Sequence, residues 1–125
     1  MSDENFIELR GVRKFFGSVA AVEHVDLSIA RSAFFSLLGP SGCGKTTLLS
    51  MLGGLEYPSA GNILIDGADV TRVPPYRRPT NMVFQSYAIF PHLSVGDNIA
   101  YGLRRIGLDK AARRRRVGEM LDLIC

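Results

Sequence analysis

Apolar and polar residues alternate along the first thirty positions of the chain. In residues 6–16 the apolar side of the alternation is formed by Ile7, Leu9 and Phe15, which we expect to be buried. The opposite side is polar except for Phe16. After the turn residues Gly17 and Ser18 the alternation resumes, with an apolar side formed by Val25, Leu27 and Ile29. A period of two residues is typical of half-buried strands, so the pattern predicts two antiparallel strands.

The next segment is apolar almost without interruption. Residues 34–38 read Phe-Phe-Ser-Leu-Leu and lead into Gly39, which is typical of a strand buried on both faces. Residues 46–54 then place leucines at helical spacing, at Leu48, Leu49 and Leu52, and glycines end the helix. A buried strand, a glycine-rich loop and a helix are therefore predicted in succession.

The rest of the chain predicts one further strand and two helices. Residues 62–66 form a short strand that ends in the turn signal Asp66-Gly67, and a proline-rich loop at residues 74–79 precedes the segment 81–85. The first helix begins at Ser94 with Asp97 three residues later, which resembles a capping box with Asp in place of Glu. The apolar face of the second helix consists of Val117, Met120, Leu121 and Ile124. Nothing downstream covers that face, so we expect the domain to continue in a longer protein.

Length and composition fit one small domain or less, with 125 residues, 13.7 kDa and 46% apolar residues. No apolar run approaches the roughly 18 residues that a membrane span requires, and the polar N-terminus lacks the pattern of a signal peptide. Cys43 and Cys125 are far apart in sequence, and a disulfide at Cys43 would obstruct the glycine-rich loop. We therefore expect a reducing, cytoplasmic setting.

The net charge is only +3, but basic residues are concentrated in residues 104–116. Arg113, Arg114, Arg115 and Arg116 are consecutive, and Asp109 is the single acid of this stretch. Such a run is compatible with nucleic acid or anionic lipid as a ligand, but no aromatic residues that would stack on bases lie between the arginines. We interpret it as a solvated helix face and predict no nucleic-acid partner.

Residues 39–47 match the pattern G-x-x-x-x-G-K-[ST] of a phosphate-binding P-loop. Glycines let the backbone approach phosphate oxygens, and the first N–H groups of the following helix are unpaired and partly positive. Lys45 is expected to reach the β- and γ-phosphates, Thr46 to bind magnesium and Thr47 to bond the α-phosphate. The predicted nucleotide-binding residues of the loop are Gly39, Pro40, Ser41, Gly42, Cys43, Gly44, Lys45, Thr46 and Thr47. We assign Cys43 only the role of a small loop residue.

The P-loop, the following Leu48-Leu49 and, above all, residues 82–95 (MVFQSYAIFPHLSV) resemble the ATP-binding subunits of ABC importers. The similarity is closest to the subgroup that serves polyamines, maltose and iron, and it extends from about Phe6 to the end of the chain. It implies an α/β fold of the ABC ATPase type, with a P-loop NTPase core and an N-terminal antiparallel β-subdomain, here incomplete. Residues 1–125 would then form the N-terminal portion of one nucleotide-binding domain, with the β-subdomain, Walker A, the Q-loop and the start of the helical subdomain.

The resemblance also implies roles for residues outside the P-loop. Gln85 would be the Q-loop glutamine, which binds magnesium together with Thr46 and couples the site to the membrane subunit. Because it ends the predicted segment 81–85, it is expected at the end of a core strand. Phe16 would stack on adenine, and residues 87–93 would receive a helix of the permease. The family's catalytic glutamate, Walker B aspartate, signature motif and switch histidine do not occur in these 125 residues, so Lys45 and Gln85 only assist.

The resemblance implies a transport ATPase that binds Mg-ATP and couples its hydrolysis to solute uptake through a membrane permease, with polyamines as the favoured solute. Its expected partners are a second ATP-binding subunit in a dimer, the transmembrane permease subunits and, indirectly, a solute-binding protein. Its expected location is the cytoplasm, peripherally on the inner face of the cell membrane. Two alternatives remain: a truncated fragment that only binds nucleotide, and a P-loop kinase or GTPase of another family. The isolated chain is expected to bind ATP better than it hydrolyses it.

Overall fold

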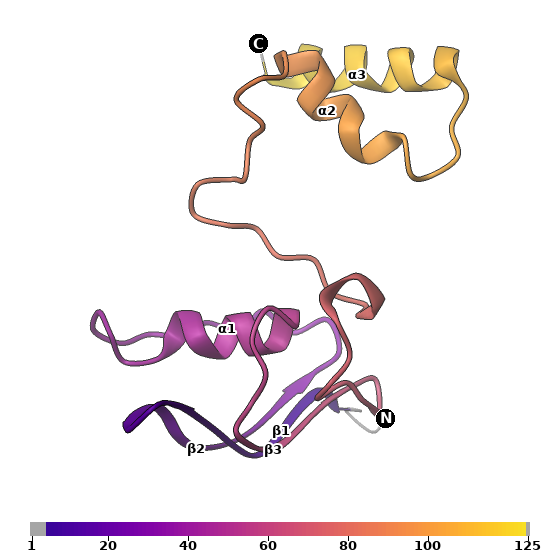
Figure 1. The fold of residues 1–125 in the computed structure, drawn as a ribbon. Coiled ribbons are helices and arrows are strands. Elements are labelled where there is room, and N and C mark those ends of the chain that lie inside the picture. Colours follow the sequence, from indigo (N-terminus) through magenta and orange to yellow (C-terminus); the bar gives the residue numbers. More distant parts are fainter. Residues whose placement is uncertain (1–4, 125) are drawn as a thin grey trace. The chain divides into compact units, whose positions relative to one another are not determined.

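The computed structural model describes residues 5–124, which fall into two compact units that meet in sequence between Met82 and Val83. The first unit contains all the strands and α1, and the second contains α2 and α3 (Figure 1). None of the described helices is long and apolar enough to cross a bilayer.

The first unit is built on a four-stranded sheet in the order β2-β1-β3-β4. Its strands are β1 (Asn5–Phe16), β2 (Val19–Ala30) and β3 (Ala60–Ile65), which are labelled in Figure 1, and β4 (Ala68–Asp69). Every neighbouring pair is antiparallel. Asp66 and Gly67 join β3 to β4 with φ of 51° and 75°, as expected for a hairpin turn of the Asp-Gly type. The predicted leading hairpin, the short later strand and its turn are therefore confirmed.

The prediction that Phe15 is buried was wrong, because β1 does not keep one alternation along its length. Its pairing with β2 shifts register between Leu9 and Val12, around Gly11 with φ of 56°. An irregularity of this kind reverses which face the following residues occupy. Val12 is consequently fully buried, whereas Phe15 is 43% exposed.

Helix α1 (Lys45–Gly53) packs on the sheet and completes the core of the first unit. The helix ends at Gly54, whose left-handed backbone closes the last turn, as predicted from the glycines. Leu48 is buried as expected, but Leu49 is exposed, and the second buried residue of the helix is Met51. The buried core residues are Leu9, Val12, Val22, Leu48, Met51, Ile63, Ile65 and Val70.

The predicted buried strand at residues 34–38 was also wrong. Residues 33–40 have no regular secondary structure, and Phe34 and Leu38 are 97% and 93% exposed. A strand buried on both faces needs hydrogen-bonded neighbours, and no strand of the described residues pairs with this segment. Residues 81–84 are likewise irregular, so Gln85 begins a turn and does not end a core strand.

The proline-rich stretch forms a loop as predicted, with one short 3₁₀ turn, η1 (Pro75–Arg77). Arg78 follows this turn and is almost completely buried in the first unit.

The second unit contains the two predicted helices, α2 (Val95–Leu103) and α3 (Lys110–Ile124). Ser94 caps α2 by accepting a hydrogen bond from the Asp97 N–H at 3.1 Å, as the capping pattern indicated. The predicted apolar face of α3 is half-buried except at Ile124, which is exposed. The arginine cluster lies on α3, where Arg116 pairs with Glu119 at 2.8 Å.

Candidate nucleotide-binding site

The P-loop backbone turns sharply before α1. The Cys43 N–H donates to the Pro40 carbonyl at 3.4 Å, and Gly42 and Gly44 adopt left-handed conformations with φ of 80° and 93°. Glycine adopts this region without steric cost, whereas other residues are strained there. Both predicted loop glycines are therefore required by the backbone itself.

Gly44 has a second reason to lack a side chain. A Cβ placed on it would lie 2.4 Å from the carbonyl oxygen of Ala21 in β2, well inside van der Waals contact. The loop therefore lies directly against the backbone of β2. No local pattern singles out Ala21 in the sequence, because it contributes a main-chain carbonyl rather than a side chain.

The N-terminus of α1 is open to an anion. Its N-cap residue is Gly44, no side-chain hydrogen bond caps it, and its first turn contains no acidic residue. The Leu48 N–H donates to the Gly44 carbonyl at 2.9 Å, so the N–H groups of the preceding residues of α1 have no carbonyl within the helix. These groups carry the positive end of the helix dipole, which attracts phosphate.

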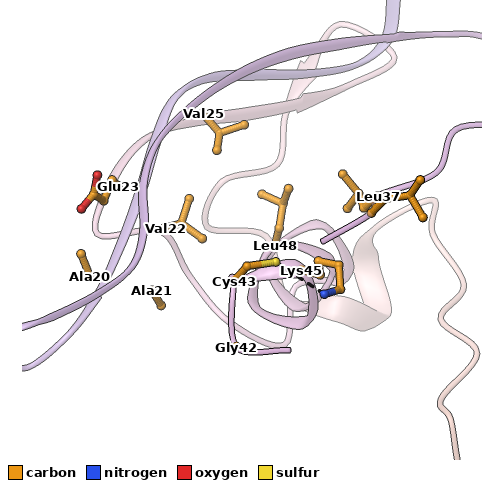
Figure 2. A pocket seen from close by; sticks show the side chains of 12 residues that line it. Ala20, Ala21, Val22, Glu23, Val25, Leu37, Gly42, Cys43, Lys45 and Leu48 are labelled. Carbon is orange, nitrogen blue, oxygen red and sulfur yellow. Dashed lines mark hydrogen bonds between the residues drawn. The ribbon is translucent and has the colours of Figure 1, made fainter. Parts of the chain in front are cut away.

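These residues surround a small hollow of about 250 Å³. Its lining residues are Ala21, Ser41, Gly42, Gly44, Lys45, Thr46 and Thr47. A larger hollow of about 410 Å³ adjoins it between β2 and the loop, with Val22, Cys43 and Leu48 among its lining residues (Figure 2). Together they offer a polar end for phosphates beside a partly apolar wall, as is typical of ligand sites.

The Lys45 side chain is folded back over the loop. Its Nζ donates to the carbonyl of Gly39 and, at 2.7 Å, to that of Pro40. It also lies 3.5 Å from the Cys43 sulfur (Figure 2). The ammonium is thus held by the loop that would hold a phosphate. A bound triphosphate would offer it stronger, charge-assisted hydrogen bonds in exchange for these carbonyls.

Three hydroxyl residues line this hollow, Ser41, Thr46 and Thr47, and the P-loop pattern makes Thr46 the candidate magnesium ligand among them. Hydroxyl and phosphate oxygens are hard donors of the kind that magnesium prefers. No group of three or more His, Cys, Asp or Glu residues that would hold a metal occurs within residues 5–124. The hollow therefore suits a magnesium ion that arrives with phosphate oxygens.

Comparison with known proteins places this loop in a family. The sequence profile of the ABC transporter family matches residues 22–124. The chain belongs to the ABC transporter family.

Two curated ABC relatives resemble the chain about equally. It is 53% identical over 126 residues to the spermidine/putrescine import ATP-binding protein PotA of Mesorhizobium japonicum, an alignment that covers 98% of the chain and 35% of the relative. It is 52% identical over 124 residues to the Fe(3+) ions import ATP-binding protein FbpC of Photorhabdus laumondii, over 99% of the chain and 35% of the relative. The chain spans about a third of the length of these relatives. The predicted resemblance to importer subunits is confirmed.

Solved ABC cassettes confirm the predicted fold type. The chain matches the dimeric structure of the bacterial ABC transporter cassette MJ0796 with a TM-score of 0.79 and 30% identity, over 93% of the chain and 56% of that cassette. It also matches a post-hydrolysis dimer of MJ0796 bound to ADP and Pi, with a TM-score of 0.73 and 28% identity over the same shares. The chain therefore has the fold of an ABC ATPase, even though its segment 34–38 is irregular.

Phe16, the predicted adenine platform, ends β1 and is 48% exposed. Its ring is covered by a cation, since the Lys14 Nζ lies 4.8 Å from the ring centroid. Phe16 does not line either hollow at the P-loop. The structure thus leaves Phe16 exposed but does not bring it into the phosphate site.

Gln85, the predicted Q-loop glutamine, belongs to the second unit and is exposed. It begins a turn in which Tyr87 and Ala88 both have positive φ, of 59° and 50°. Left-handed backbone at two consecutive non-glycine residues costs energy and is often found at functional segments. The Q-loop segment and the P-loop therefore belong to different units of the structure.

Asn98 organises the segment that follows Gln85, a role that the sequence pattern did not indicate. From the first turn of α2 its side chain accepts the Phe90 N–H at 3.0 Å and donates to the carbonyls of Phe90, Leu93 and Ser94 at 3.2, 3.3 and 2.9 Å. The Phe90 ring also packs on Tyr101, with ring centroids 4.5 Å apart. Residues 90–94 are thereby fixed to the start of α2.

Proposed function

We propose that the chain binds Mg-ATP at its P-loop and serves as the ATP-binding part of an ABC importer. The observation that carries the proposal is the uncapped N-terminus of α1, preceded by left-handed glycines and surrounded by Lys45, Thr46 and Thr47 at a phosphate-sized hollow. Residues 1–125 form, in this proposal, the N-terminal portion of one nucleotide-binding domain.

Within the proposed site each group has one task. The backbone N–H groups of the loop and the first turn of α1 hold the phosphates, with Lys45 on the β- and γ-phosphates and Thr47 on the α-phosphate. Thr46 and Gln85 are ligands of the magnesium ion or of its water. Phe16 stacks on adenine once Lys14 moves from its ring.

The proposed biological activity is ATP hydrolysis coupled to solute uptake by the whole importer. In it the chain pairs with a second ATP-binding subunit, contacts permease subunits and, through them, serves a solute-binding protein on the other side of the membrane. Its site is therefore the cytoplasmic face of that membrane. We propose a polyamine-type solute, in line with the polyamine importer relative, although the iron importer relative is similar to nearly the same degree.

Nucleotide binding without turnover is what we expect of residues 1–125 by themselves. Among the described residues no carboxylate lines the smaller hollow, so we expect no general base there next to the phosphates. The rival interpretation as a P-loop kinase or GTPase is excluded by membership of the ABC family.

The first experiment compares Mg-ATP affinity of the wild-type chain and Lys45→Ala by titration calorimetry. A hydrogen bond from a charged donor contributes about 1.5–3 kcal/mol, so its loss should weaken binding at least about tenfold. Lys110→Ala, which removes an exposed lysine of α3, is the control and should bind like the wild type. Equal affinity of the wild type and Lys45→Ala, with unchanged circular dichroism, would reject the site.

The adenine contact is tested with Phe16→Ala. Affinity for ATP should fall while affinity for inorganic tripolyphosphate stays the same, because only ATP carries a base that stacks on the ring. A parallel loss for both ligands would show that Phe16 supports the loop and not the base.

A further inference from the structure

The ammonium of Lys14 lies over the ring of Phe16, the proposed adenine platform. Its Nζ is 4.8 Å from the ring centroid, within the range of a cation–π contact. Lys14 and Phe16 are two residues apart on β1, and Phe16 is 48% exposed. The ring that would receive a base is therefore already in contact with a cation of its own strand.

Two further groups hold this ammonium in place. The Nζ of Lys14 lies 2.8 Å from a carboxylate oxygen of Glu56 and donates to the Tyr57 carbonyl at 2.9 Å. Hydrogen bonds that join two charged groups are stronger than those between neutral groups. The Lys14 side chain is also only 14% exposed. Lys14 is consequently not a freely moving surface lysine, because its ammonium has a defined position.

The loop that holds Lys14 is also joined to β1 by main-chain hydrogen bonds. The Ser59 N–H donates to the Arg13 carbonyl at 2.7 Å, and the Phe15 N–H donates to the Ser59 hydroxyl at 3.0 Å. These two bonds fix the residues on either side of Lys14. The loop after α1 and the end of β1 therefore form one ordered structure around the Lys14 side chain.

Phe16 lies beside the strand that forms one wall of the P-loop hollows. In the pairing of β1 with β2, Phe15 is opposite Ala20, and Phe16 follows it. Ala20 lines the larger hollow, and its neighbour Ala21 lines both (Figure 2). Neighbouring strands are about 5 Å apart. The end of β1 that carries Phe16 is thus one strand away from the wall of the site, within the same unit.

We infer that Lys14 sets the affinity of the proposed adenine subsite, because its ammonium and the base compete for the same face of the Phe16 ring. The inference rests on the proposed function, since it concerns the adenine contact of that same site. A cation–π contact at an exposed site is equivalent to about two- to fivefold in an equilibrium constant. Stacking of a base on an aromatic ring is equivalent to about five- to 150-fold. ATP can therefore displace the ammonium, and its affinity is lowered by the cost of doing so.

The test compares the affinity for ATP with the affinity for inorganic tripolyphosphate, which has no base, both in excess Mg²⁺. Lys14→Met keeps the apolar stem of the side chain and removes the ammonium. It should raise the ratio of the ATP affinity to the tripolyphosphate affinity about two- to fivefold, because the base no longer displaces a cation. The loss of one positive charge acts on the phosphates of both ligands, so the ratio removes that general effect.

Arg10→Met is the matched control, because Arg10 is a cation of the same strand that pairs with Glu8 at 2.7 Å. It should keep the wild-type ratio. The inference is overturned if Lys14→Met keeps the wild-type ratio or lowers it, since a lower ratio would mean that Lys14 supports the ring for stacking. An equal rise in Arg10→Met would also overturn it, because the effect would then be one of net charge.

A double-mutant cycle relates the effect to the ring. In the Phe16→Ala background, Lys14→Met should leave the ratio unchanged, since no ring remains for which the ammonium and the base compete. A rise in that background would overturn the inference alone. If Phe16→Ala by itself keeps the wild-type ratio, the proposed adenine contact fails, and the inference fails with it.

A measurement on the wild-type chain decides the question if Lys14→Met does not fold. An aromatic ring shifts the NMR signals of protons above its face upfield, so the methylene protons next to the Lys14 ammonium report on the contact. Mg-ATP should move these signals toward their positions in Phe16→Ala, whereas tripolyphosphate should leave them in place. Signals that stay upfield in saturating Mg-ATP would show that the base does not displace the ammonium, and would overturn the inference.

Discussion

Gly42 and Gly44 make the same conformational demand on the P-loop but differ in their surroundings. Both have positive φ, yet a Cβ on Gly42 would meet nothing within 4 Å, whereas one on Gly44 would collide with the Ala21 carbonyl. At the scale of single residues, a comparison of these two glycines therefore distinguishes the effect of backbone strain from that of a steric clash.

We predict that Gly44→Ala lowers Mg-ATP affinity and stability more than Gly42→Ala. The Gly42 variant carries only the left-handed strain, on the order of 1–2 kcal/mol. The Gly44 variant must in addition push the loop away from β2. Thermal unfolding and calorimetric titration of both variants check this order, and equal losses would contradict the importance of the Ala21 contact.

Single residues also show where pattern reading succeeds and where it fails. The P-loop was predictable because its function lies in local backbone and in side chains at fixed spacing. Arg78 was not, because it stands next to Arg77 in the same proline-rich loop and nothing local distinguishes the two. Only the carbonyls around it, of which those of Met51 and Leu52 come from the distant helix α1, distinguish it from Arg77.

At the scale of elements, α1 connects the core of the first unit to the nucleotide site. Its N-terminus offers the phosphate-binding N–H groups, and Leu48 and Met51 bury the same helix in the core. A helix of nine residues is not stable by itself in water, so its packing maintains the geometry of the P-loop.

Met51→Ala should therefore destabilise the first unit by about 2–5 kcal/mol, because it removes a fully buried side chain from the core. Leu49→Ala, on the exposed side of the same helix, is the control and should cost less than about 1 kcal/mol. Denaturant unfolding measures both. A comparable loss in the two variants would mean that α1 is not packed by the face containing Met51.

The errors in the predicted elements have two different physical causes. In β1 the irregularity around Gly11 moves Val12 inward and Phe15 outward, which a strict period of two does not anticipate. In residues 34–38 the apolar composition is that of a buried strand, but a strand is defined by its hydrogen-bonded neighbours. The apolar composition of a segment does not show whether other strands will pair with it.

At the scale of the whole molecule, the chain consists of two units with separate internal contacts. The first is held by an apolar core between the sheet and α1. In the second, a large part of the order of residues 90–94 depends on the polar side chain of Asn98.

Asn98→Ala should accelerate amide hydrogen exchange in residues 90–94 and leave exchange in α1 unchanged. The variant removes four hydrogen bonds between the loop and the start of α2, whereas no Asn98 contact reaches α1. Exchange monitored by mass spectrometry checks both segments, with α1 as the internal control. Slow exchange retained at residues 90–94 would show that another contact fixes this loop.

The sequence by itself determined the P-loop, the leading hairpin, the helices and the resemblance to ABC importers. Each of these depends on residues that are close together in sequence, since turns, caps and helical spacing are local. Only the tertiary structure decided which face of β1 and α1 is buried and which arginine is enclosed by carbonyls. Those features depend on contacts between residues far apart in the chain, and the free energy of such contacts is set by packing that no local pattern encodes.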